Sequence, residues 1–292
     1  MAPVRVRRSA QPRKLSEIHF TMEPEAVTTK AVILARGLGT RMRKEDNAAK
    51  LDASQDAAAD AGMKGMIPIG RPFMDYLISA LADAGFEEVC LVIGPEHASV
   101  QNYYEDTLAV TRVRMAFAVQ KKPLGTADAV LAAESFCGGD PFVIMNSDNY
   151  YPIAALAELH RRRVPALIAF QRSSLVRLGN VPESKLARFG ALDIDDSGYL
   201  RRVIGEAGGR SNDDIYASLN CWLFTSEIFR ACREVPLSAR GEFELPQAVQ
   251  LGIDAMNMRF EAIRMNAPVL DMSSRSDIAS VAEHLRDVEV RL

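Results

Sequence analysis

A short apolar run that breaks into glycines and arginines, Lys30 to Arg43, is the feature that most constrains the fold. Residues Ala31 to Ala35 are all apolar and predict a buried strand of a parallel sheet. The strand is followed at once by Gly37, Gly39, Thr40 and Arg41. Glycines let backbone N–H groups approach an anion, and a guanidinium adds a fork of donors. The segment is not a P-loop, and Met42 replaces the third glycine of a dinucleotide fingerprint, so either a phosphate loop or a plain tight turn fits it.

Composition narrows the partners of the chain. Its 292 residues are 48% hydrophobic, enough for a sizeable core. With 35 Lys and Arg against 38 Asp and Glu, the net charge of −3 provides no field that favours nucleic acid or an anionic membrane. No apolar stretch approaches the roughly 18 residues of a membrane helix. We therefore expect small-molecule partners, with no nucleic acid and no membrane.

The four cysteines are widely spaced and form no C-x-x-C pair. Buried reduced thiols are therefore expected rather than disulfides or a metal site, which suits a cytoplasmic protein. Residues 1–28 carry several basic residues without an apolar segment after them and predict a disordered basic tail, with a partner-binding arm as the alternative. Lys44 to Gly62 is rich in Ala and Asp and predicts a surface arm that is partly helical.

Strands and helices alternate through the first half of the chain. Strands are predicted at 88–94, 115–119, 141–146 and 166–171, and helices at 71–85, 127–136 and 153–163. This alternation predicts an α/β fold, a Rossmann-like doubly wound and mainly parallel sheet. After residue 188 the pattern becomes mixed, with a hairpin that turns at 195–198, a strand at 216–224 and a last helix near 277–286. These additional mixed strands would form a second lobe.

Four pieces occur in order along the chain. They are the loop GLGTRM at Gly37 to Met42, then Lys64, then QKKPLGTADAV at Gln120 to Val130, then IMNSDNYY with Asp148 after an apolar strand. Together they resemble the sugar-1-phosphate nucleotidylyltransferase family, also called nucleotide-sugar pyrophosphorylases. The resemblance runs from about Lys30 to the C-terminus, and makes 29–292 a nucleotidyltransferase catalytic domain whose mixed strands form a sugar-binding lobe.

The resemblance implies Mg²⁺-dependent transfer of a nucleotidyl group from a nucleoside triphosphate to a sugar 1-phosphate. It assigns catalytic roles to Arg41 on the β- and γ-phosphates and to Lys64 on the α-phosphate, and makes Asp148 the main Mg²⁺ ligand. Asp271 in APVLDMSS would be the second metal carboxylate, with Asp277 looking like a helix-start residue. Alternatively, Asp148 makes a turn or a helix cap at the end of its strand, and Lys64 is a solvated surface residue without a catalytic role.

The same resemblance places the nucleotide. Its implied binding residues are Leu34, Ala35, Gly37, Gly39, Thr40, Gln120, Gly125 and Thr126. The amide of Gln120 carries both an acceptor and donors, which match the O and N–H edge of uracil or thymine. In the resembled family a Gln at this place accompanies pyrimidine substrates, so the resemblance favours UTP or dTTP over GTP or ATP. Alternatively, Gln120 caps an edge of the sheet.

The sugar side departs from the family. Relatives often have Glu-Lys-Pro after the hairpin, whereas this chain has Glu206-Ala207-Gly208, so the cation that grips the sugar phosphate is missing. The candidates to replace it are Arg172, Lys185, Arg188 and Arg210. Glu206, Ser218 and Asn220 are the candidates to contact sugar hydroxyls, with structural roles as the alternative, and Asn220 tolerates backbone conformations that a glycine would adopt.

Three more departures bear on the reading. Arg36 stands where relatives have a small residue, and would contact phosphate or point to solvent. Met272, Ser273 and Ser274 replace the Ile-Gly-Thr that usually follows the second aspartate, and the spacer from Arg41 to Lys64 is longer than in compact relatives.

The predicted reaction is transfer of UMP or dTMP to a hexose or amino-sugar 1-phosphate. A sensor or regulatory subunit that has lost turnover is the alternative from another class. A cytidylyltransferase for a non-sugar phosphate such as phosphocholine is the alternative within enzymes, and would require aromatic side chains around the acceptor. No hexapeptide repeat follows, so no acyltransferase domain is expected, and the sequence leaves homo-oligomerisation open.

Overall fold

The computed structural model describes residues 27–46, 49–187, 189–204 and 211–292. Its strands are β1 (Lys30–Leu34), β2 (Glu88–Ile93), β3 (Arg114–Val119), β4 (Phe142–Asn146), β5 (Asn149–Tyr150), β6 (Ala166–Gln171), β7 (Ala191–Ile194), β8 (Leu200–Ile204), β9 (Tyr216–Ala217), β10 (Trp222–Phe224), β11 (Glu261–Met265) and β12 (Leu270–Asp271). Its α-helices are α1 (Ala53–Ala61), α2 (Phe73–Asp83), α3 (Ala98–Asn102), α4 (Thr126–Ala132), α5 (Glu134–Cys137), α6 (Ile153–His160), α7 (Arg172–Arg177), α8 (Glu183–Leu186), α9 (Ile228–Glu234), α10 (Leu245–Met256) and α11 (Asp277–Leu285). Three single turns add η2 (Lys64–Met66), η3 (Pro95–His97) and η4 (Tyr103–Thr107).

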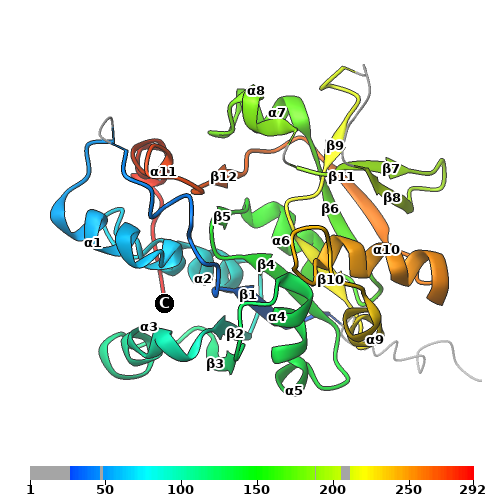
Figure 1. Ribbon diagram of the computed structural model, residues 1–292, viewed down its shortest axis with the longest axis horizontal. Coiled ribbons are helices and arrows are strands. Elements are labelled where there is room, and N and C mark those ends of the chain that lie inside the picture. The colour runs from blue at the N-terminus through cyan, green and yellow to red at the C-terminus, as the bar shows by residue number, and fades with distance from the viewer. Residues whose placement is uncertain (1–26, 47–48, 188, 205–210) are drawn as a thin grey trace, which may run out of the picture.

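One large sheet runs through the molecule in the order β3-β2-β1-β4-β10-β6-β9-β7-β8, with β11 also paired to β6 (Figure 1). The first four of these strands are parallel, with Leu34 of β1 opposite Asn146 of β4. Beyond β4 the neighbours are mostly antiparallel, because β10 runs against both β4 and β6. The predicted Rossmann-like parallel sheet with additional mixed strands is therefore confirmed.

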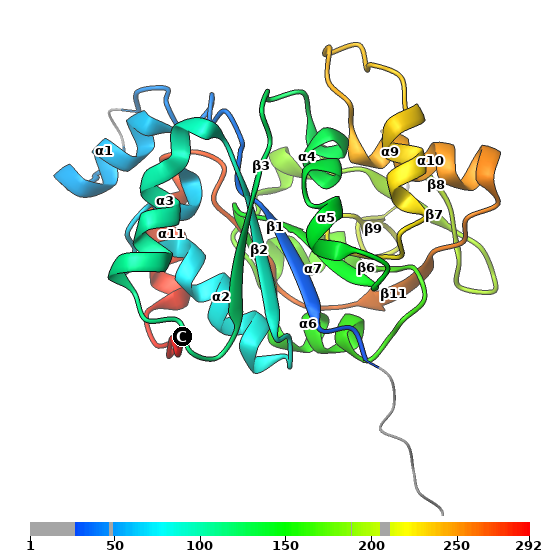
Figure 2. The ribbon, with the colours of Figure 1, turned by 90° about the horizontal axis from the view of Figure 1, so that it is seen from below.

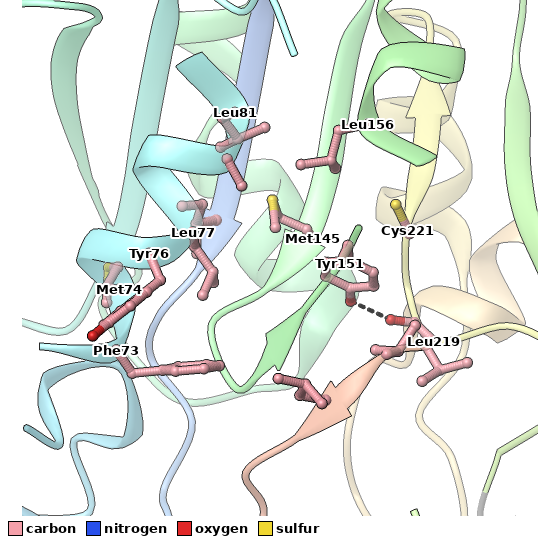
Figure 3. Close-up of a cluster of buried hydrophobic side chains, with 14 of the residues drawn as sticks. Phe73, Met74, Tyr76, Leu77, Leu81, Met145, Tyr151, Leu156, Leu219 and Cys221 are labelled. Carbon is pink, nitrogen blue, oxygen red and sulfur yellow. Dashed lines mark hydrogen bonds between the residues drawn. The ribbon is translucent and has the colours of Figure 1, made fainter. Parts of the chain in front are cut away.

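Helices cover both faces of the sheet (Figure 2). On one face α2, α6 and α11 contribute Leu77, Leu156 and Val281 to one buried apolar cluster, and Figure 3 shows part of this cluster. There the hydroxyl of the fully buried Tyr151 donates to the carbonyl of Leu219 at 2.5 Å, which ties the chain after β5 to the chain before β10. On the other face α4, α9 and α10 pack around aromatic rings, with Phe229 of α9 stacked on Phe142 of β4. The result is three layers with two separate apolar cores.

Most predicted elements lie where the sequence placed them, and two do not. The predicted strand 216–224 is two short strands, β9 and β10, because the chain leaves extended geometry at Asn220, which has φ of +57°. The pairing register against β6 shifts between them, as at a β-bulge. The predicted helix 127–136 is likewise divided into α4 and α5 at Ala133, whose ψ is 0°.

The ends and the surface follow the composition. The predicted tail, residues 1–28, lies outside the described residues except for Val27 and Thr28, and Thr28 is buried against the carbonyls of His160 and Arg162. The arm contains one helix, α1, which confirms that it is partly helical. All four cysteines are buried free thiols, and burial raises the pKa of Cys90 to about 12. In the described ranges no helix has the length and apolar character needed to cross a bilayer.

Candidate active site

The site lies where the parallel strands end. At the carboxyl ends of β1 and β4, Leu34 stands opposite Asn146, and the amide of Ser147 donates to the carbonyl of Leu34 at 3.3 Å. The loop from Ala35 and the Ser147–Asp148 turn therefore leave the sheet side by side. In sheets of this kind, the carboxyl edge is where ligands bind.

The glycine-rich loop is anchored in the core and packs closely against the end of α1. Met42 is fully buried in the core and anchors the loop, while Arg41 remains exposed. Gly39 has φ of +60°, and a Cβ built there would lie 2.5 Å from the backbone oxygen of Gly62. Only glycine fits this close approach of two backbones. Gly62, which ends α1 in the left-handed conformation, is thereby placed in the wall of the site.

Lys64 and Asp148 meet in this site. The Lys64 ammonium lies 2.7 Å from a carboxylate oxygen of Asp148, and the two side chains are only 15% and 20% exposed. Lys64 sits in the turn η2, two residues after Gly62, so the arm delivers it to the end of β4. A cation and a carboxylate in contact beside a glycine-rich loop form a polar centre that can accept both a metal ion and phosphate oxygens.

Asp271 lies behind Asp148. The short pair β5–β12 sets Asp271 opposite Asn149, and the amide of Met272 donates to the carbonyl of Asp148 at 2.8 Å. The Asp271 carboxylate accepts from Asn149 at 3.2 Å and from the Ser273 hydroxyl at 2.7 Å. Burial, and then the charge of Asp148, raise the pKa of the Asp271 carboxyl. The fold therefore brings the two predicted carboxylates together.

Asp277 has the separate role that its position suggested. It opens α11, and its carboxylate accepts from the amide and hydroxyl of Ser274 and from Lys185 at 2.6 Å. Burial opposes its ionisation, but Lys185 and Ser274 outweigh burial and lower the pKa of Asp277. It therefore supports the chain after Asp271.

The donor set fits magnesium. Mg²⁺ is usually held in proteins by one or two carboxylates, with substrate phosphates and water completing the shell. Asp148 and Asp271 supply two carboxylates, and burial, followed by the charge of Asp148, raises the pKa of the Asp271 carboxyl. The described part of the chain contains no cluster of three or more His, Cys, Asp or Glu suited to a metal.

Gln120 forms the opposite wall. It follows β3, is 3% exposed, and donates through Nε2 to the carbonyl of Gly125 at 3.0 Å and to the carboxylate of Asp128 at 2.8 Å. Both amide hydrogens are thus used within the protein. The sequence suggested that Gln120 offers donors and an acceptor to a base, but the hydrogen-bond pattern leaves Oε1 as its available group.

Gly125 and Thr126 connect this wall to a second loop. Gly125 has φ of +113°, and its neighbours bond to Phe243, whose amide donates to the carbonyl of Leu124 at 2.7 Å. The Thr126 hydroxyl accepts from the amide of Leu245 at 2.8 Å, at the start of α10. The loop before α10 therefore backs the segment that was predicted to face the base and ribose.

One cavity of about 340 Å³ collects most of the predicted site. Its walls include Leu34, Ala35, Gly37, Gly39, Thr40, Arg41, Lys64, Gln120, Gly125, Thr126, Asp148 and Asn220. Asp271 and Ser218 are not in its wall: Asp271 is buried behind Asp148, and the Ser218 hydroxyl accepts from the amide of Asn220 at 3.3 Å. Glu206 lies outside the described residues.

Two of the four side chains that could replace the family's sugar-phosphate lysine lie in the described part of the chain. Arg172 is buried and donates to the carbonyl of Phe189 at 2.6 Å, and Lys185 is paired with Asp277. Arg188 and Arg210, the other two candidates, fall outside the described residues, as do Ala207 and Gly208. The structure therefore turns the two described candidates toward protein groups.

Some wall residues were not predicted. They are Leu38, Gly62, Pro123, Ala129, Asn146, Ser147 and Glu242. Asn146 and Ser147 could have been inferred, because they directly precede Asp148 at a strand end, whereas Glu242 arrives from a distant loop. Arg36, whose role was open, contacts the Glu96 carboxylate twice at 3.2 Å and donates to the carbonyl of Gln120 at 2.5 Å, so it joins the glycine loop to the Gln120 wall.

A doubly wound sheet that presents a glycine loop, basic side chains and paired carboxylates at one edge defines an enzyme that handles phosphorylated nucleotides. A family model described as nucleotidyl transferase matches residues 59–285. The chain therefore belongs to the nucleotidyl transferase family, and the resemblance to sugar-1-phosphate nucleotidylyltransferases is confirmed.

Named relatives agree with this family. The chain is 26% identical over 258 residues to the UTP–glucose-1-phosphate uridylyltransferase AglF of Haloferax volcanii, covering 88% of this chain and 96% of that protein. It is 30% identical over 227 residues to a glucose-1-phosphate thymidylyltransferase of Streptomyces antibioticus, covering 77% of this chain and 57% of that protein. Among solved structures, a UTP-bound UGPase from Acinetobacter baumannii superimposes with a TM-score of 0.68 at 20% identity, over 90% of this chain and 95% of that chain. This last likeness concerns the fold.

Proposed function

We propose that the protein transfers a uridylyl or thymidylyl group to a sugar 1-phosphate in the presence of Mg²⁺. The observation that carries this proposal is the Lys64–Asp148 contact of 2.7 Å inside a cavity that also contains the glycine loop and Arg41. Relatives named for UTP or thymidylyl transfer to glucose 1-phosphate support the same pair of substrates.

The reaction needs two polyanions to meet in line. A phosphate oxygen of the sugar 1-phosphate forms a bond to the α-phosphorus, and the bond from that phosphorus to the β-phosphate oxygen breaks, so that pyrophosphate leaves with the electron pair. Arg41 would offset charge on the leaving pyrophosphate, and Lys64 would offset charge that develops around the α-phosphorus. Asp148 and Asp271 would hold the Mg²⁺, which when bound draws the phosphate oxygens together and neutralises part of their charge.

The Gln120 wall supports the choice of base. Because its amide hydrogens are donated to Gly125 and Asp128, Oε1 is the group available to a base, and it requires an N–H partner. The N3–H of uracil or thymine provides that partner, whereas N3 of cytosine is an acceptor, so Oε1 selects uracil or thymine where the contact is made at N3 and not at the N4 amino group of cytosine. Among the described residues lining the cavity there is no aromatic side chain, so the wall gives no support to a phosphocholine acceptor.

The test is release of pyrophosphate. Purified protein is incubated with Mg²⁺, each of five nucleoside triphosphates and a panel of hexose and amino-sugar 1-phosphates, with Asp148→Asn as the matched inactive control. We expect turnover with UTP or dTTP and one class of sugar phosphate. Absence of pyrophosphate from every combination would overturn the proposal, and stabilisation by nucleotide sugars without turnover would identify a sensor instead.

A further inference from the structure

A buried arginine, Arg275, connects three segments that are far apart in the sequence. Its side chain is 5% exposed. Its Nε donates to the carbonyl of Met42 at 2.9 Å, and its two terminal nitrogens contact the carboxylates of Asp56 and Asp60, the second at 2.5 Å. A guanidinium has a fixed fork of donors, so one side chain can hold all three acceptors at once.

Each of the three contacts leads to the candidate site. Met42 belongs to the glycine loop and directly follows Arg41. Asp56 and Asp60 are four residues apart and therefore share one face of α1, the helix of the arm. Arg275 itself lies four residues after Asp271, in the turn before α11.

The C-terminal end of the arm contacts the glycine loop of the candidate site. Gly62 abuts Gly39 in the loop, and Arg43 of the loop donates to the carbonyl of Ala61 at 2.8 Å. Lys64 follows two residues later. The position of α1 therefore fixes the wall beside the loop and the start of the turn that delivers Lys64 to Asp148.

Two departures from the resembled family lie at this contact. The lengthened spacer between Arg41 and Lys64 supplies the two aspartates, and the arginine directly follows the altered segment Met272–Ser274. Without the aspartates, the buried guanidinium of Arg275 would lose its charged partners, which is unfavourable. Together the aspartates and the arginine form a connection among the loop, the arm and the chain that carries Asp271.

We propose that Arg275 is a positioning residue that docks the α1 arm onto the glycine loop and thereby sets the affinity for the triphosphate. This inference rests on the proposed function, since it assumes that the loop binds a nucleoside triphosphate. Asp56 and Asp60 are 58% and 67% exposed, so these contacts contribute little to overall stability. Their effect is expected in the placement of the loop and Lys64.

The test compares Arg275→Met and Arg275→Lys with Arg286→Met, an exposed arginine of the same region that pairs only locally with Glu283. Three quantities are measured: the dissociation constant of UTP with Mg²⁺ by calorimetry, the rate of tryptic cleavage after the exposed Lys50 in the arm, and the melting temperature. We expect Arg275→Met to weaken UTP about tenfold and to speed cleavage. Arg275→Lys should recover part of the affinity for UTP. Arg286→Met should leave the dissociation constant, the cleavage rate and the melting temperature unchanged.

The outcomes separate the inference from the proposed function. Faster cleavage with unchanged UTP affinity would mean that the docked arm has no bearing on the triphosphate, and would overturn the inference. Unchanged cleavage in Arg275→Met would overturn the docking itself. If Arg275→Met binds UTP more weakly than the wild-type protein, but the wild-type protein releases no pyrophosphate, the inference stands and the proposed function fails.

Discussion

Replacing Gly125 by alanine should destabilise the protein and loosen the cavity wall formed by Gln120, Gly125 and Thr126. Gly125 has φ of +113° and ψ of 178°, a conformation that is open almost only to glycine. A Cβ at this position would lie 2.5 Å from the backbone oxygen of Phe243 and 2.8 Å from its backbone nitrogen. The contact is with backbone, so no side chain can rotate away to relieve it.

The magnitude follows from two terms. The backbone conformation costs about 1–3 kcal/mol for a residue other than glycine. Moving Phe243 weakens two backbone hydrogen bonds, of 2.7 Å to the carbonyl of Leu124 and of 2.9 Å from the amide of Ala127, each worth about 1 kcal/mol. We therefore expect Gly125→Ala to lower the free energy of unfolding by about 3–5 kcal/mol.

Two other glycines supply matched controls. Gly138 has φ of +59° with no atom within 4 Å of a built Cβ, so Gly138→Ala isolates the conformational term. Gly139 also has open space and no left-handed φ, so Gly139→Ala should change stability by less than about 0.5 kcal/mol. Urea unfolding can be followed by fluorescence of Trp222, the one tryptophan, which is fully buried.

The order of the three variants decides the matter. Gly125→Ala should be the least stable, then Gly138→Ala, then Gly139→Ala, and only Gly125→Ala should also raise the KM for the nucleotide. A loss of stability in Gly125→Ala no larger than in Gly138→Ala would show that the Phe243 backbone moves aside freely. The inference that the Phe243 backbone fixes the position of Gly125 would then be wrong.

Three other changes test separate parts of the structure. Asp148→Asn should abolish pyrophosphate release while leaving the fold intact by circular dichroism, and EDTA should do the same to wild-type protein until Mg²⁺ is restored. Asp128→Asn should free the Gln120 amide to turn, so that the ratio of kcat/KM for UTP over CTP falls about tenfold, while an unchanged ratio would exclude Asp128 as the residue that orients it. Asp75→Asn removes a fully buried carboxylate that accepts from Arg71 and Tyr104 at 2.8 Å each, and should lower the free energy of unfolding by about 2–4 kcal/mol in urea titrations, with pyrophosphate release unchanged below the transition.

Local pattern was enough to predict part of the site. The glycine loop and Asp148 each follow an apolar strand, and parallel strands place their carboxyl ends at one edge, so neighbours in the sheet meet there. Asp271 could be assigned only through resemblance, because its approach to Asp148 depends on a two-residue pairing across 122 positions of sequence. Arg275 had no local signal, since its partners Asp56 and Asp60 lie more than 200 positions away.

The division of the predicted strand 216–224 shows a different limit. Asn220 was expected to tolerate a glycine-like backbone conformation, but that it adopts one, with φ of +57°, is decided in the fold, where β9 and β10 keep different registers against β6. The hydrogen-bond partners of Gln120 could not be predicted for a similar reason: its donors are taken by Gly125 and by Asp128 on the next helix, a contact that only the folded loop creates.

The antiparallel strand β10 extends the rule that ligands bind at the carboxyl ends of parallel strands. Because β10 runs against β4, the residue that precedes β10 lies beside the residue that ends β4. Asn220 thus reaches Asn146, at 3.5 Å between side chains, although it comes before its strand and not after it. One edge of the sheet therefore gathers strand ends from the parallel half and strand beginnings from the mixed half. Under the proposed function, Asn220 would face the sugar phosphate while the loop after β1 faces the triphosphate, so substitution of Asn220 should alter the KM for the sugar phosphate more than the KM for the nucleotide.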